Sequence, residues 1–81
     1  MAEWWDKRTQ DAVERIGMNV RLLRTERRLT QEDVALESGM ARSHLSQLER
    51  GVVAPSIHTL LRLSDALDVA PSELLRDVAS R

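Results

Sequence analysis

Apolar residues recur along the first third of this chain at the three- and four-residue spacing of an amphipathic α-helix. The stretch 11–28 is expected to be helical, with a stripe of Val13, Ile16, Val20 and Leu23. Gly17 beside this stripe would let a neighbouring element approach closely. Residues 1–11 are polar apart from Trp4 and Trp5, and either extend this helix or fray.

The last third of the chain repeats this spacing twice. Ser56 is a suitable N-cap for a helix over 57–67, whose buried stripe consists of Leu60, Leu63 and Leu67. Pro71 fits the first turn of a final helix, SELLRDV. Proline has no backbone N–H, and an N–H in the first turn would have no acceptor within the helix. Its broad apolar face consists of Leu74, Leu75 and Val78.

Two short helices are predicted between these segments, in TQEDVALESGMARSHLSQLERG, residues 30–51. Thr30 with Asp33 makes a capping-box start, since the hydroxyl and the carboxylate can both bind backbone N–H groups of the first turn. Gly39 can end this helix in the left-handed conformation. The second helix is expected over 42–50, and Gly51 follows it. The stretch therefore predicts a helix-turn-helix.

The second of these helices has an apolar side and a polar side. At about 100° per residue, Leu45 and Leu48 lie on the packed side, and Glu49 lies near it. The opposite side is free of acidic residues and consists of Arg42, Ser43, Ser46, Gln47 and Arg50. Such donors and acceptors suit base edges in a major groove, although any surface helix carries polar residues outside.

The spacing within this stretch resembles the Cro and phage-repressor (XRE-type) family of helix-turn-helix regulators. With Gln31 as the first position, Ala35 is fifth, Gly39 ninth, Leu45 fifteenth and Leu48 eighteenth. The resemblance covers residues 16–75 and includes IGMNVRLLR, LTQEDVA, LSQLERG, PSIHTLLRLSDAL and PSELL. It implies an all-α, lambda-repressor-like fold, a compact bundle of about five short helices. The DNA-binding domain would span 12–79, after an N-terminal extension over 1–11.

The resemblance also implies roles for particular residues. Residues at the positions of Arg42, Ser43 and Gln47 contact bases in that family, and the residue at the position of Gln31 contacts a phosphate. An arginine and a glutamate at the positions of Arg24 and Glu49 form an interhelical ion pair there. The alternative for these two is a pair of independent surface charges.

Further contacts are predicted from position alone. Ser46 projects with the base-reading side chains, while the phosphate contacts expected from placement are Arg28, Arg50 and Ser56, the last at a helix N-terminus. Ala41 and Ala70 stand where the resembled family usually has a capping Ser, Thr or Asp, and each missing cap would cost about 1 kcal/mol.

Charge is the main argument against DNA binding, because the net charge of the chain is −1. Its distribution weakens that argument. Residues 15–28 contain five arginines and one glutamate, whereas residues 65–77 contain four acidic residues and one arginine. A basic end can therefore meet phosphates while the acidic end faces away.

Composition excludes several other classes of protein. Eighty-one residues suffice for one small domain, and without cysteine there is neither a disulfide nor a thiolate metal site. His44 and His58 are too few for a convincing metal site, and no nucleophile with its base or glycine-rich phosphate loop is visible. We expect no enzyme, cofactor or metal. MAEWWDKR lacks the apolar run of a signal peptide, and no membrane span is visible, which predicts a cytoplasmic protein.

The predicted function is sequence-specific transcriptional regulation, resembling phage Cro proteins and the small controller proteins of restriction-modification systems. One recognition helix reads too few base pairs, so a homodimer on a pseudo-palindromic operator is expected. Its interface would be Leu74, Leu75 and Val78, with Trp4 and Trp5 as the second choice. A contact with RNA polymerase remains open for such a regulator. The alternative is an antitoxin-like or other protein-interaction module with the same fold.

Overall fold

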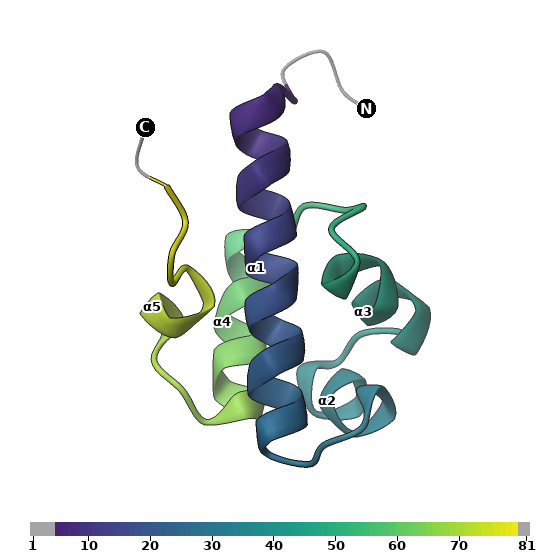
Figure 1. Ribbon diagram of the computed structural model, residues 1–81. Coiled ribbons are helices and arrows are strands. Elements are labelled where there is room, and N and C mark those ends of the chain that lie inside the picture. Colours follow the sequence, from purple (N-terminus) through teal and green to yellow (C-terminus); the bar gives the residue numbers. More distant parts are fainter. Residues whose placement is uncertain (1–4, 80–81) are drawn as a thin grey trace.

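The computed structural model describes residues 5–79, and within them it contains five α-helices and no strand. These are α1 (Lys7–Glu26), α2 (Gln31–Ser38), α3 (Arg42–Glu49), α4 (Ile57–Leu67) and α5 (Pro71–Leu74). In Figure 1 the long α1 runs through the middle, with α2 and α3 on one side of it and α5 on the other. The all-α prediction is confirmed.

The first helix begins earlier than the hydrophobic stripe suggests. Asp6 is its N-cap, and the carboxylate accepts a hydrogen bond of 2.8 Å from the backbone N–H of Thr9. This hydrogen bond lowers the pKa of Asp6. The question left open for residues 1–11 is thus answered for 7–11, which belong to α1, while Trp4 lies outside the described residues.

Both ends of α2 agree with the sequence prediction, whereas α3 begins without a side-chain cap. Thr30 and Asp33 form the complete capping box, and the backbone hydrogen bond from Thr30 lowers the pKa of Asp33. Gly39 ends α2 with a φ of 68°. Ala41 precedes α3 without a side-chain cap, as Ala70 does before α5.

The hydrophobic core lies between the five helices, each of which contributes at least one buried side chain, and it is aliphatic. Its most buried side chains, each less than 2% exposed, are Val20, Val34, Leu45, Leu48, Leu63, Leu67 and Leu74. The second helix of the motif, α3, therefore packs by the side that the periodicity predicts. The opposite side of α3 remains for other contacts.

Helices α1 and α3 approach each other closely at Gly17. A Cβ atom on this residue would lie 2.3 Å from the carbonyl oxygen of Leu48 and 2.8 Å from that of Glu49. Real Cβ atoms do not come so near to a carbonyl oxygen. The absence of a side chain at Gly17 thus fixes how deeply α3 sits against α1.

The final helix is shorter than predicted, and its apolar face differs accordingly. It ends at Leu74, and Asn19 of α1 donates hydrogen bonds of 3.0 and 2.8 Å to the carbonyl oxygens of Leu74 and Arg76. These bonds occupy carbonyl groups at the helix end, which turns away instead of continuing to Val78. Leu74 is 0% exposed, so its prediction as an interface residue is corrected to a core role; Leu75 is 46% exposed.

Candidate nucleic-acid interface

The outer side of α3 is an uninterrupted polar surface. Arg42, Ser43 and Gln47 are exposed along it, Arg50 is exposed at its C-cap, and Ser46 is half-buried. The acidic residue of this helix, Glu49, is turned to the packed side and is 9% exposed. The predicted base-contacting residues therefore share a surface from which acidic side chains are absent.

A groove of about 210 Å³ lies beside α3, where α1, α2 and α3 meet. Its lining residues are Arg21, Arg24, Gln31, Ser46, Glu49 and Arg50. Three residues predicted to contact DNA, Gln31, Ser46 and Arg50, are thus brought together from both helices of the motif. Arg21 of α1 was not among the predicted contacts.

The predicted pair of Arg24 and Glu49 is present at the bottom of this groove. The Arg24 Nε donates to Glu49 Oε2 at 2.6 Å and its Nη2 to Oε1 at 3.0 Å, in a bidentate arrangement. The side chains are 13% and 3% exposed, and the hydrogen bond to Glu49 raises the pKa of Arg24. The third nitrogen of Arg24, Nη1, donates to the carbonyl oxygen of Leu29 at 2.9 Å. The pair ties α1 to α3 and neutralises the carboxylate under the polar surface.

Gln31 takes part in the same network. Its Nε2 donates to Glu49 Oε1 at 3.1 Å, so the buried carboxylate holds the side chain of the first residue of α2. This bond could not be predicted from the sequence, because no local pattern relates two residues 18 positions apart. An amide nitrogen carries two hydrogens, and the second stays available for a phosphate oxygen.

The other predicted contacts lie outside the groove. Arg28 is exposed just after α1, in the left-handed conformation with a φ of 58°. Ser56 caps α4: its hydroxyl oxygen accepts from the N–H of Thr59 and its O–H donates to Thr59 Oγ1, both at 3.0 Å. Ser56 thus uses its hydroxyl within the fold, while Arg28 has its guanidinium at the surface.

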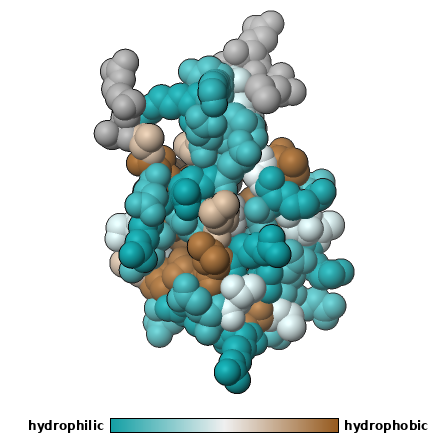
Figure 2. Space-filling model, in the orientation of Figure 1, coloured by the Kyte–Doolittle hydropathy of each residue, from teal (hydrophilic) through white to brown (hydrophobic). Residues whose placement is uncertain are grey.

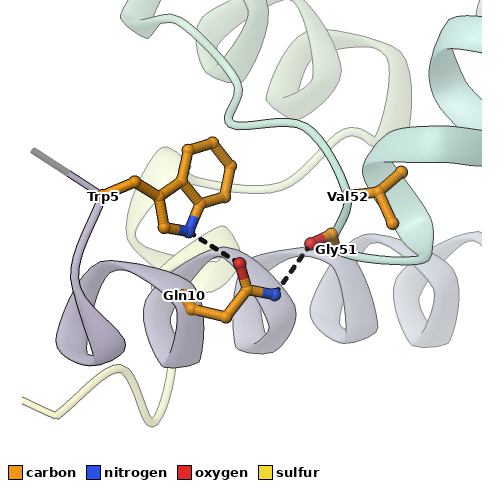
Figure 3. Close-up of a pocket in the computed structure, with 4 residues that line it drawn as sticks. All are labelled: Trp5, Gln10, Gly51 and Val52. Carbon is orange, nitrogen blue, oxygen red and sulfur yellow. Dashed lines mark hydrogen bonds between the residues drawn. The ribbon is translucent and has the colours of Figure 1, made fainter. Parts of the chain in front are cut away.

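The turn that follows α3 is hydrogen-bonded to the first turns of α1 (Figure 3). The indole N–H of Trp5 donates to Gln10 Oε1 at 2.6 Å, and Gln10 Nε2 donates to the carbonyl oxygen of Gly51 at 3.1 Å. An open pocket of about 300 Å³ lies here and is also lined by Val52. This contact holds the C-terminal end of α3 in position, and sequence spacing gave no sign of it.

Metal-binding and membrane-spanning features are absent from the described part of the chain. Among residues 5–79, no three His, Asp or Glu side chains gather closely enough to hold a metal ion. No helix in the same range has the length and apolar character needed to cross a membrane.

Comparison with known proteins agrees with this geometry. The helix-turn-helix family model matches residues 20–74, which is more than half of the chain. The chain belongs to this family. Its helix-turn-helix regulators are non-enzymatic DNA-binding proteins of the XRE type, so the predictions of family and of a non-enzymatic role are confirmed.

Among relatives of this helix-turn-helix protein is the uncharacterized HTH-type transcriptional regulator y4dJ of Sinorhizobium fredii. It is 45% identical over 60 residues, which are 74% of this chain and 78% of y4dJ. The crystal structure of the restriction-modification controller protein C.AhdI from Aeromonas hydrophila is 40% identical, with a TM-score of 0.75 over 76% of this chain and 94% of that one. The P22 c2 repressor, solved in complex with a synthetic operator, is 31% identical, with a TM-score of 0.70 over 75% and 92% of the two chains.

Proposed function

We propose that this helix-turn-helix protein is a sequence-specific transcriptional regulator that binds a pseudo-palindromic operator as a homodimer. The observation that carries the proposal is the acid-free polar side of α3, bordered by the groove that contains Gln31, Ser46 and Arg50. The similarity to a repressor solved with its operator and to a restriction-modification controller protein supports it.

In the proposed complex, residues 42–50 lie in the major groove. Arg42, at the leading end of α3, can bind the two acceptors of a guanine, and Gln47 can bridge an adenine. Ser43 and Ser46 accompany them as base contacts. The phosphate contacts are Gln31, Arg28 and Arg50, together with Ser56, which would act through the backbone N–H groups at the N-terminus of α4 because its hydroxyl is used in the cap. These contacts set orientation without carrying sequence information.

Selection of bound sequences from a random duplex pool tests this function. A DNA reader should enrich a motif with two related halves, and should bind nonspecific duplex at low salt with an affinity that falls as salt rises. An antitoxin-like module would give neither result. No retention on duplex DNA at low salt would overturn the proposal and favour the protein-interaction alternative.

Arg42→Ala and Gln47→Ala are expected to weaken operator binding by about 1–3 kcal/mol per half-site and to relax the preference at particular base pairs. Arg50→Ala is the matched control on the same helix, because loss of a phosphate contact should weaken operator and random duplex alike. Fluorescence anisotropy with both duplexes measures the ratio. If the Arg42 and Gln47 variants stay folded and lose affinity equally for both duplexes, α3 is not the reader.

The proposed dimer surface lies between α1 and α5, where Figure 2 shows a hydrophobic patch on an otherwise largely hydrophilic face. Met18 and Leu22 of α1 are each 49% exposed, and Leu75 follows α5. Val78, half-buried against the core, borders the same region. The charged residues nearby have both signs, Arg15, Glu26, Glu73, Arg76 and Asp77. Mixed charges around an apolar centre suit a two-fold interface, in which each surface meets its own copy.

Leu75→Glu is expected to convert the homodimer to a monomer, because two carboxylates would be buried at the centre of a two-fold contact. Sedimentation velocity at tens of micromolar measures the change. Ile57→Glu is the matched control, since Ile57 is 73% exposed at the start of α4 and is not one of the residues of the proposed surface. A monomeric Ile57 variant together with a dimeric Leu75 variant would move the interface to α4.

A further inference from the structure

Arg21 lies in the groove beside the polar side of α3, although it belongs to α1 and stands outside the helix-turn-helix stretch. Its side chain is exposed and lines the groove together with Gln31, Ser46 and Arg50. Across residues 5–79, no carboxylate forms an ion pair with it. Its charge thus faces the groove without compensation inside the fold.

The charges that line the groove do not cancel. Three of the lining residues are arginines and one is a glutamate. Arg24 and Glu49 neutralise each other in the bidentate pair, and the Glu49 carboxylate also accepts from Gln31. Two positive charges therefore remain, Arg21 from α1 and Arg50 from the end of α3.

The shape and chemistry of the groove suit a phosphate group. Guanidinium groups bind phosphate oxygens through two parallel hydrogen bonds. The remaining amide hydrogen of Gln31 offers a further donor in the same groove. The one acidic side chain is occupied by three donors and 3% exposed, so it does not repel an anion at the surface.

We propose that this groove binds one phosphodiester of the DNA backbone and that Arg21 is one of the residues that hold it. The proposal rests on the proposed function and extends it, because it makes α1 part of the DNA interface. A phosphate here would bridge all three helices, so DNA binding would also resist their separation. The contact carries no sequence information and adds equally to operator and nonspecific affinity.

The test is the salt dependence of DNA binding by Arg21→Gln, compared with Arg27→Gln. Arg27 is the exposed C-cap of α1 and does not line the groove, so its replacement removes the same charge elsewhere. Each lost phosphate contact lowers the slope of log affinity against log salt by about 0.9. Loss of affinity between 50 and 200 mM salt should therefore be about threefold smaller per subunit for Arg21→Gln than for Arg27→Gln. Arg21→Lys, which keeps the charge, should stay near the wild-type slope.

The outcomes separate this proposal from the one on which it rests. If the wild-type protein binds duplex DNA and the Arg21 and Arg27 variants have equal slopes, Arg21 holds no phosphate, while the DNA-binding function stands. If the wild-type protein binds no duplex at low salt, both proposals fail. Circular dichroism and urea unfolding of each variant show that it is folded before its slope is compared.

Discussion

Gly17→Ala is expected to lower the free energy of unfolding by about 3 kcal/mol, because the new methyl group would collide with backbone and not with a movable side chain. Without any shift of the helices, this methyl carbon would lie 2.3 Å from the Leu48 carbonyl oxygen. Alanine raises helix propensity by about 1 kcal/mol, which offsets only part of this cost. Urea unfolding gives the change, and a fall in operator affinity should accompany it, since α3 must move away from α1.

The sign of the change in stability distinguishes a crowded position from an open one. At an uncrowded helical position, alanine in place of glycine stabilises, so an increase in stability would show that α1 and α3 do not approach closely at Gly17. Leu36→Ala, at a position of α2 that is 83% exposed and belongs neither to the dimer surface nor to the DNA contacts, is the control. It removes side-chain volume without adding any contact and should cost less than Gly17→Ala.

Glu49→Ala is expected to cost about 3 kcal/mol of stability, because it leaves the guanidinium of Arg24 without its carboxylate in a site where that side chain is only 13% exposed. Gln31 would lose its partner as well. The variant should therefore also bind all DNA sequences more weakly, through a less ordered phosphate-binding side chain.

A double-mutant cycle with Arg24→Ala separates the pair from its surroundings. We expect a coupling of about 2 kcal/mol, with the double variant less destabilised than the sum of the single ones. Because a well-packed apolar pair can replace a buried ion pair at little cost, Arg24→Met with Glu49→Leu should recover stability while DNA affinity stays low. Additive single effects would show that the two charges act independently.

The parts of the fold that the sequence predicted well are those encoded by neighbouring residues. The capping box of Thr30 and Asp33, the left-handed Gly39 and the N-cap Ser56 each depend on chemistry within one turn, and all are observed. The faces of α3 follow from periodicity in the same way. Family membership followed from the joint spacing of several such signals.

The errors arose where distant residues decide the outcome. The last helix ends at Leu74 because Asn19, 55 positions earlier, donates a hydrogen bond to its carbonyl oxygen. A local apolar pattern cannot contain that information, so Leu74 and Leu75 looked alike although one is buried and the other exposed. The start of α1 was left open for a different reason: Asp6 caps the helix through the N–H of Thr9, a local signal that lies upstream of the apolar stripe.

In the candidate site, too, local features could be predicted from the sequence and long-range ones could not. The outward side chains of α3 could be listed from the sequence, whereas the groove could not, because its walls come from three helices. Arg21 was not among the predicted contacts, because only the packing of α1 against α3 places it beside Gln31. The charge pattern of residues 15–28 was the one signal that pointed to this end of α1.

The length of α1 has a consequence for the operator. In the proposed complex, this single helix of 20 residues carries both Arg21 at the DNA and Leu22 at the dimer surface. With no hinge between them, each subunit presents its recognition helix at a fixed distance from the two-fold axis. Inserting one base pair between the half-sites rotates one of them by about 34° about the duplex axis. A stiff connection cannot follow that rotation, so the spacing of the half-sites should be as strictly selected as their sequence.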